Sequence, residues 1–294
     1  MSAKHIRQCP CSFLIFITLI FSLLLLNVYA QDAESDNFNN EVDSYVRHIP
    51  SRSVKAQSGK VEVIESGVKY TYKLKLFDKL PVELSVNPEY VSINRSVAVE
   101  LPSHLTGFST DIETTLPFFN LARTYFRIGL SPSFYGDNWA FSSSNFRIPS
   151  RFFCIYQPNE KWTFICGIAV YPRYENSVLP IAGFIYKAND KLVFYIVPHR
   201  PNISYALTDR VTLFVEGDSS IAEFVVNRDN SENVILRYAQ AHLGSGARFK
   251  INKSIETSLS AGEVFNHYLR YRDSGGKAGI KDGLYVEFRI QARI

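Results

Sequence analysis

Cysteine, methionine and tryptophan are scarce in this chain of 294 residues, which contains four, one and two of them. Two of the cysteines lie within the first 11 residues, so only Cys154 and Cys166 remain for the rest of the chain. Two cysteines are too few for a disulfide scaffold. The sequence also has no cluster of His, Cys, Asp and Glu at metal-ligand spacing and no phosphate-binding glycine motif before a helix. We therefore expect neither a metal site nor a cofactor.

A strong charge of either sign is absent as well. The formal net charge is +4, from 32 basic and 28 acidic residues. Two of the basic residues, Lys4 and Arg7, lie in a segment that we expect to be removed, which leaves 30 basic residues and a net charge of +2. A balance this close to neutral gives no indication of a nucleic-acid partner.

Long apolar runs are limited to one, over residues 13–26. It follows Lys4 and Arg7 and precedes Val28, Tyr29 and Ala30, which is the order of a secretory signal peptide. We predict cleavage after Ala30, because the run is shorter than the ~20 residues of a membrane-spanning helix; an uncleaved anchor is the alternative. Any further membrane insertion must use strands.

The polar segment over residues 31–57 follows the signal peptide, with acidic residues first and basic residues later. It has few apolar groups to offset the entropy of ordering it, so we predict a disordered N-terminal segment, with a short plug or docking segment as the alternative. The predicted organisation is therefore a signal peptide (1–30), a disordered segment (31–57) and one β-domain (58–294).

Alternation of apolar and polar residues dominates the chain beyond Gly67. In "VKYTYKLKL", residues 68–76, every second residue is apolar, and the chain ends on the alternating stretch "GLYVEFRIQARI", residues 283–294. A period of two predicts strands with one apolar face. Helical periodicity is weak everywhere, and residues 219–226 are its best example. The same alternation recurs at 82–87, 126–131, 203–207, 211–215 and 255–262.

The connections between the predicted strands alternate in length. Short turns are expected at 77–80, 120–122, 157–160, 187–190, 207–209 and 251–253, and long loops at 94–104, 135–149, 216–233 and 270–283. This sorting is typical of an antiparallel up-and-down transmembrane β-barrel, with turns on one side of the membrane and loops on the other. Such barrels have even strand numbers, so the thirteen segments that we count predict about 12 to 14 strands. A soluble β-sandwich is the alternative, favoured by prolines beside the strands.

The face opposite each apolar stripe carries small, polar and charged residues, which suit the interior of a barrel. A narrow polar pore and an interior filled by ion pairs are equally compatible with these side chains. The charged residues that we predict to line the lumen are Lys69, Lys73, Lys75, Glu83, Asp111, Glu113, Arg127, Arg248, Lys250, Glu256, Glu287, Arg289 and Arg293.

With the apolar leader "LIFITLIFSLLLL", the short turn in "YALTDRVTLFVEG" and the terminal "YVEFRIQARI", the chain resembles bacterial outer-membrane β-barrel proteins of an uncharacterised family. The resemblance covers residues 60–294 and implies a Gram-negative outer membrane, contact with membrane lipid, and a terminal strand that is read by the assembly machinery. That strand usually ends on Phe or Trp, whereas this chain ends on Ile294. We expect the terminal strand to pair with the first and so close the ring.

The remaining cysteines and the histidines are the side chains with the most reactive chemistry. Cys154 and Cys166 flank the turn at 157–160, so a cross-strand disulfide is feasible in an oxidising compartment, with two free thiols as the alternative. His199, His242 and His267 are candidates for a general base, but no spacing around them matches a hydrolase motif. We therefore predict that the protein is not an enzyme.

Together these patterns predict an outer-membrane β-barrel that is a narrow passive channel for small solutes or a structural surface protein. A secreted soluble β-sandwich that binds a ligand is the second hypothesis. A lipid-modifying barrel enzyme that uses His242 or His267 is the third.

Overall fold

The computed structural model describes residues 40–55, 58–76, 80–97, 100–118, 121–139, 141–198, 200–228, 231–272 and 276–294, without the side chains of residues 228, 231 and 232. The predicted signal peptide lies outside these residues. Within them, every regular element is a strand, and no helix is long and apolar enough to cross a membrane.

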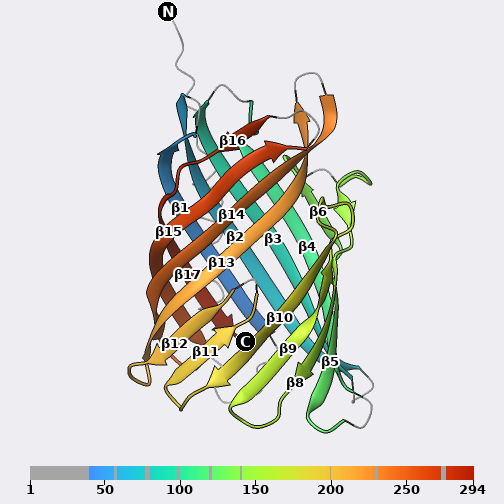
Figure 1. Cartoon of the computed structure of the whole chain (residues 1–294), viewed down its shortest axis with the longest axis vertical. Coiled ribbons are helices and arrows are strands. Elements are labelled where there is room, and N and C mark those ends of the chain that lie inside the picture. Colours follow the sequence, from blue (N-terminus) through green and yellow to red (C-terminus); the bar gives the residue numbers. More distant parts are fainter. Residues whose placement is uncertain are drawn as a thin grey trace, which may run out of the picture.

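The strands form one antiparallel sheet that closes on itself (Figure 1). β5 and β6 form one ring strand that is interrupted near Pro132, and β7 and β8 form another that is interrupted near Pro149. β16 continues into β17, so the 17 strands make a ring of 14. The strands are β1 (Asn40–Ser53), β2 (Gly59–Leu76), β3 (Leu80–Val97), β4 (His104–Pro117), β5 (Thr124–Leu130), β6 (Ser133–Gly136), β7 (Phe146–Arg147), β8 (Ser150–Tyr156), β9 (Trp162–Val170), β10 (Val178–Lys187), β11 (Leu192–Ile196), β12 (Asn202–Ala206), β13 (Val211–Arg228), β14 (Ser231–Lys250), β15 (Ile255–Tyr271), β16 (Lys277–Gly279) and β17 (Gly283–Arg293). This confirms the all-β barrel and the predicted strand number.

The ring closes between β1 and β17, where the ladder runs from Glu41 opposite Arg293 to His48 opposite Val286. The amide N of Asn40 also donates to the carbonyl O of Ile294, at 2.9 Å. β17 pairs with β15 on its other edge. The terminal strand is therefore paired along its length, which explains why its alternation continues to the end of the chain.

The prediction of a disordered segment over residues 31–57 is wrong for residues 40–53, which form β1. β1 pairs with both β2 and β17. Its low apolar content misled the prediction, because a barrel strand with a polar inner face needs few apolar residues. Two ladders of backbone hydrogen bonds offset the entropy of ordering it.

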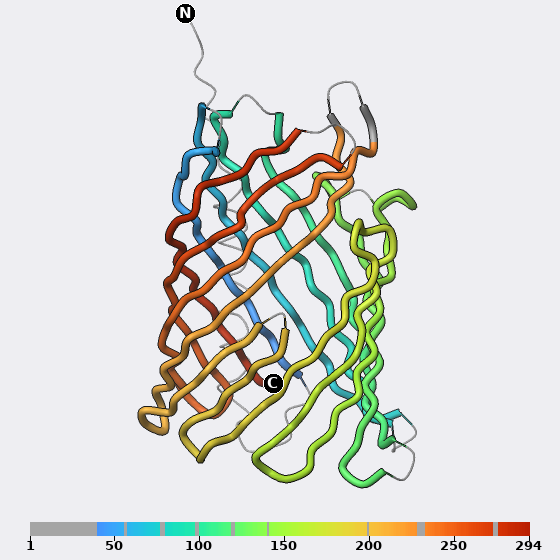
Figure 2. Tube along the Cα trace, viewed as in Figure 1, coloured from blue at the N-terminus to red at the C-terminus, as the bar shows by residue number. Residues whose placement is uncertain are grey.

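One of the predicted long loops is mostly strand, and a second is strand in part. β13 and β14 run through most of residues 216–233 and pair from Val211 opposite Phe249 to Arg228 opposite Ser231. β15 and β16 occupy part of the predicted loop at 270–283. Residues 219–226, the best helical candidate, lie inside β13. The long strands β13, β14 and β15 run from the short-turn end of the barrel to its opposite end (Figure 2).

The wall is interrupted above β11 and β12, which have only five residues each. Among the described residues, 178–183 of β10 pair as a strand only with β9, and 218–224 of β13 pair only with β14. Pro180 lies on this stretch of β10, which is unpaired on one edge. Because proline has no N–H, that edge has one donor fewer that needs a partner. Figure 1 shows β11 and β12 ending far below the tip of β13. We call this stretch the wall interruption.

The barrel narrows toward its loop end, opposite the short turns. There β6 pairs with β4 and also meets β13, through Gly136 opposite Val225. The ring at that level therefore passes directly from β4 through β6 to β13, without β8 to β12. The short-turn end keeps the full set of strands.

The apolar face of the long strands changes side along their length. On β14, Leu243 points outward and is 56% exposed, whereas Leu236 points inward and is fully buried. On β2, Tyr70 and Tyr72 are exposed on the outer surface, whereas Val61 and Val63 are buried inside. Apolar side chains on the outer face are suited to contact with lipid. Where the apolar side chains point inward, the polar ones point outward, and that outer face is suited to contact with water. The short-turn half is therefore built for the bilayer and the loop half for an aqueous surround.

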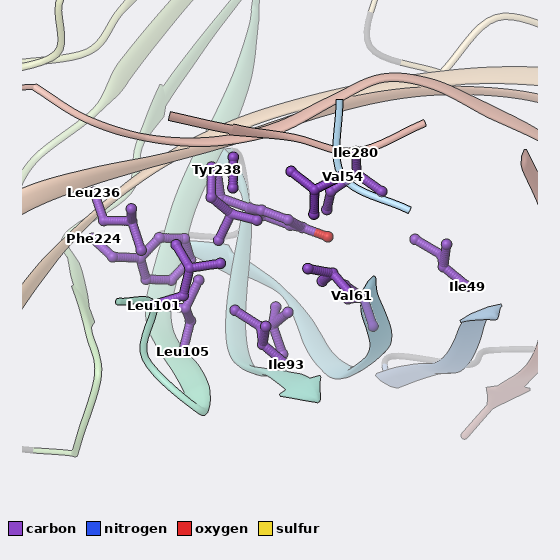
Figure 3. Packing of buried hydrophobic residues seen from close by; sticks show 14 of the residues in the cluster. Ile49, Val54, Val61, Ile93, Leu101, Leu105, Phe224, Leu236, Tyr238 and Ile280 are labelled. Atoms are coloured by element: carbon purple, nitrogen blue, oxygen red, sulfur yellow. The ribbon is translucent and has the colours of Figure 1, made fainter. Parts of the chain in front are cut away.

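The inward apolar residues of the loop half form one core inside the barrel (Figure 3). Ile49, Ile93, Leu105 and Leu236 belong to it and come from strands all around the ring. Leu101, in the connection between β3 and β4, is fully buried in the same core. The core closes the interior at the loop end.

Aromatic rings cover the outer surface near the short turns of β9 to β11. Trp162 stacks on Tyr186, with ring centroids 4.3 Å apart, and lies beside Phe164 and Phe184. Such a belt is typical of the membrane interface of outer-membrane barrels.

Candidate functional site

The interior of the short-turn half is the candidate site, because the charged side chains predicted from the sequence converge there. Alternation along β2 to β5, β14, β15 and β17 places all thirteen predicted residues on the inner face, opposite exposed apolar residues such as Tyr72, Ile112 and Leu259. They do not form one group. Two clusters of ion pairs occupy different sides of the lumen.

The first, which we call the lumen cluster, consists of Glu83, Asp111, Glu113, Arg127 and Arg151 on β3, β4, β5 and β8. Arg127 Nη2 lies 2.8 Å from Glu83 Oε2 and also pairs with Glu113. Arg151 Nη2 lies 3.1 Å from Asp111 Oδ1 and 2.9 Å from Glu113 Oε1. The Arg127 and Glu83 side chains are 35% and 40% exposed although they point inward. The lumen beside this cluster is therefore open to solvent.

The second, which we call the Arg47 cluster, is buried. The guanidinium of Arg47 contacts Glu65 Oε2 at 3.0 Å, Glu287 Oε2 at 2.6 Å and Asp218 Oδ2 at 3.2 Å. Tyr238 donates its hydroxyl to Glu65 Oε1 at 2.7 Å. One guanidinium thus joins β1, β2, β13 and β17 immediately below the apolar core.

Further ion pairs extend the Arg47 cluster toward the lumen. Arg289 Nη2 contacts Glu287 Oε1 at 3.1 Å, and its Nη1 contacts Asp43 Oδ2 at 2.9 Å. Arg200, in the connection between β11 and β12, reaches into the barrel and contacts Glu216 Oε1 at 3.1 Å. Arg200 therefore anchors the connection that borders the wall interruption.

The remaining wall of the lumen is apolar. On β8 to β10 the inward positions include Phe153, Ile155, Ile165, Ile181 and Ile185, all of them half-buried. Their apolar surface faces the same interior as the lumen cluster. The lumen therefore has an apolar side on β8 to β10 in addition to the two sides that carry ion pairs.

Sequence reasoning missed the centre of the Arg47 cluster. Arg47 lay in the segment predicted to be disordered, and Glu65 and Asp218 lay where no strand alternation was recognised. A signal was present: in β2 the apolar residues change from odd positions, Val61 and Val63, to even positions from Val68 onward. The charged residues of the cluster lie near such phase changes, where polar lumen gives way to apolar core.

His242 and His267 lie on neither the rim nor the outer face of the barrel. His242 and His267 are buried inside the barrel, 2% and 1% exposed, and the Nδ1 of His242 lies 3.4 Å from Arg47 Nη1. His199 lies outside the described residues. No group of three or more His, Cys, Asp and Glu in the described part of the chain is arranged to hold a metal ion.

Cys154 and Cys166 lie directly opposite each other on β8 and β9, and both are free thiols in this structure. They share the outer face with Phe164 and Ile168, so lipid surrounds them. We expect both to stay reduced and to be alkylated by a membrane-permeant maleimide in the refolded protein without reductant. Mass spectrometry would show two added labels. A mass that shows no label until reductant is added would establish the disulfide instead.

Comparison with known proteins places this architecture in a family. A model of the domain of unknown function DUF6268 matches residues 84–291, which is more than half of the chain. The chain belongs to the DUF6268 family. The matched range begins within β3, so β1 and β2, which complete the ring, lie before it. A search of curated proteins found no similar sequence.

Solved outer-membrane barrels resemble this DUF6268 protein in fold. The COG4313 outer-membrane channel from Pseudomonas putida F1 superposes with a TM-score of 0.50 at 10% identity, over 90% of this chain and 98% of that chain. The P. putida toluene transporter TodX gives 0.39 at 7% identity, over 87% and 90% of the two chains. The KdgM porin in complex with oligogalacturonate gives 0.37 at 10% identity, over 86% and 99%. The first of these likenesses shows the outer-membrane barrel fold.

Proposed function

We propose that this DUF6268 protein is a narrow passive channel for small solutes in the outer membrane of a Gram-negative bacterium, without enzymatic activity. The solvent-exposed ion pairs inside the membrane half carry the proposal. In a barrel that serves only as a scaffold, side chains fill the interior and any charge there is buried. Burial of a charge costs desolvation energy, so such a barrel has no need for charged residues in its lumen. The lumen cluster instead keeps a hydrated path beside Arg127 and Glu83.

The path leaves the barrel sideways in this proposal. The apolar core blocks the axial route at the loop end, whereas the lower end of the wall interruption between β10 and β13, at Asp218, lies next to Arg200 and Glu216, below that core. Unpaired strand edges facing lipid are costly, so their presence here needs a reason. An exit for solutes supplies one.

The combination of charged and apolar sides in the lumen favours solutes that have both an apolar part and a charged group. Such a molecule can place its apolar part against Ile165 and Ile185 while its charge remains beside the lumen cluster. A fully polar solute of the same size gains nothing from the apolar wall. The favoured substrate class is therefore small amphipathic solutes.

Planar-bilayer recording of the refolded mature chain tests the proposal, and discrete conductance steps are the expected result. Replacement of Glu83 and Glu113 by Gln removes two negative charges beside Arg127 and Arg151, so the reversal potential in a salt gradient should shift toward anion selectivity. Glu263→Gln is the matched control, because Glu263 is exposed on the outer face of β15 and its loss should leave selectivity unchanged.

The absence of any conductance in a correctly folded wild-type barrel would contradict the channel. It would favour a structural surface protein, to which the buried Arg47 cluster and the apolar core are equally suited. Correct folding is established separately, by faster migration of the unboiled sample on a gel.

A further inference from the structure

Glu89 on β3 is a carboxylate on the inner face of the barrel that forms no ion pair with any described residue. It lies between Asn87, which belongs to the polar lumen, and Val91, which belongs to the apolar core. Its side chain is exposed although it points inward. An exposed side chain on the inner face borders open space, so the Glu89 carboxylate faces the upper end of the lumen, directly below the core.

The other carboxylates of the inner face differ from Glu89 in having basic partners. Every other described carboxylate that points inward from a strand, from Glu41 on β1 to Glu287 on β17, contacts a lysine or an arginine at 3.6 Å or less. A charge inside a protein is costly unless an opposite charge accompanies it, because its desolvation is not repaid. The exception at Glu89 therefore needs a reason.

Three basic residues beyond the predicted signal peptide, Lys79, His199 and Arg228, have side chains outside the described part of the chain. Lys79 precedes β3 at the short-turn end, about 30 Å of strand away from Glu89. The backbone of Arg228 is at the loop end of β13, on the far side of the apolar core. A histidine such as His199 is mostly uncharged at neutral pH. Residues 31–39 contain no Lys, Arg or His, so a permanent cation for Glu89 has to come from a solute.

Two glycines flank Glu89, and a tyrosine ring from the next strand covers each of them. Gly67 on β2 and Gly107 on β4 lie directly opposite Glu89 on its two sides. A Cβ atom at Gly67 would meet the Tyr45 ring at 2.7 Å, and one at Gly107 would meet the Tyr135 ring at 2.8 Å. The two glycines thus bring a ring toward Glu89 from each side. We call Glu89, Tyr45 and Tyr135 the Glu89 site.

Both rings of the Glu89 site are half-buried on the inner face. The hydroxyl O of Tyr45 lies 3.3 Å from the Cβ position of Gly67, so this ring reaches across the glycine toward Glu89. Tyr135 packs edge-on against Phe224, with ring centroids 5.5 Å apart. Because Phe224 is at the upper end of the wall interruption, the Glu89 site lies between the lumen cluster and that interruption.

Tyr45 already contacts two cations of the protein. The guanidinium carbons of Arg47 and Arg289 lie 5.9 and 5.2 Å from its ring centroid. Both arginines are paired with Glu287, and neither forms an ion pair with Glu89. An aromatic ring that attracts cations and a carboxylate without a cation are therefore neighbours on the inner face.

We propose that the Glu89 site binds the ammonium group of a solute in the lumen. The carboxylate supplies a charged hydrogen-bond acceptor, and the faces of the tyrosine rings attract a cation. A charge in a narrow space with apolar walls also concentrates counter-ions around it. The apolar side on β8 to β10 accepts the rest of the solute. For transport this rests on the proposed function and narrows the favoured solutes to amphipathic amines, whereas binding itself needs no conductance.

Isothermal titration calorimetry on the refolded full barrel at mildly alkaline pH tests the Glu89 site. The probes are hexylammonium, hexanol and hexanoate, which share an apolar chain and differ in charge. We expect saturable binding of hexylammonium alone. Glu89→Gln should bind it at least about tenfold more weakly, because it removes a hydrogen bond to a charged group. Tyr45→Leu should weaken binding about threefold, and Tyr45→Phe, which keeps the ring, should retain it.

Glu41→Gln is the matched control for Glu89→Gln. Glu41 also points inward, but it lies near the short turns and contacts Lys73 at 3.6 Å. Its replacement should leave the affinity for hexylammonium at the wild-type value. Unchanged affinity in a folded Glu89→Gln barrel, or equal binding of hexanoate by the wild type, would overturn the Glu89 site.

Planar-bilayer recording separates the Glu89 site from the channel. In a gradient of hexylammonium chloride, the reversal potential of the wild type should show cation selectivity, and Glu89→Gln should reduce it. Binding of hexylammonium that depends on Glu89, without any conductance, would support the site and contradict the channel. Conductance with the same hexylammonium affinity in the wild type and in Glu89→Gln would support the channel and overturn the site.

Discussion

Replacement of Arg47 by Met is expected to lower the free energy of unfolding by about 3–5 kcal/mol, because it leaves buried carboxylates without their counter-charge. Arg47 is 5% exposed and contacts Glu65, Glu287 and Asp218, which lie on three other strands. Urea unfolding of the refolded barrel, followed by the loss of the fast-migrating band, measures the effect.

Arg248 provides the matched control for Arg47. It pairs with Glu256 at 3.1 Å, and about a third of each side chain is exposed to the lumen (34% and 35%). Exposed pairs contribute at most about 1 kcal/mol, so Arg248→Met should change the midpoint little. Equal losses for the two variants would show that the Arg47 cluster is as hydrated as the lumen, and would remove the distinction between the two groups of charges.

The second large effect is expected for Leu236→Ala in the apolar core. Removal of a fully buried leucine from a packed core costs about 2–5 kcal/mol, from the lost transfer energy and the cavity that remains. Because the core also closes the loop end, we expect this variant to unfold at lower urea than the wild type. The same urea titration reports it.

Leu243→Ala is the control on the same strand. Leu243 points outward and is 56% exposed, so its truncation leaves no cavity that lipid cannot fill. A smaller loss than for Leu236→Ala is expected. If Leu243→Ala proved the more damaging of the two, the change of apolar face along β14 would not mark the boundary between lipid and core.

The barrel was predictable because its main signals are local. A side-chain period of two and connections that alternate in length follow from strand geometry and from a membrane with two sides. β1 was missed because its order comes from pairing with β2 and β17. β17 is remote in sequence, and the pairing with β2 can be recognised only in three dimensions. The upper part of β13 was missed because its apolar residues change face, from Val215 outward to Phe224 inward.

For the lumen residues, the sequence predicted only that they lie on the inner face of the barrel. Alternation identifies which side chains point inward, and the structure places all thirteen there. It does not show which of them meet, since Glu83 and Arg127 lie 44 positions apart in the sequence. Register across several strands decides that. Arg200 was out of reach for another reason, because it enters the lumen from a connection and no strand period describes it.

The change of apolar face along the long strands has a consequence for recognition at the cell surface. Where most outer-membrane barrels present loops to the exterior, this protein also presents the part of the polar outer wall of β13, β14 and β15 that the β9–β10 connection leaves uncovered. An antibody or a phage tail fibre would meet a pleated surface fixed by hydrogen bonds on both edges of β14. Escape from such a binder would require surface substitutions within strands, because loop insertions and deletions would leave that epitope intact.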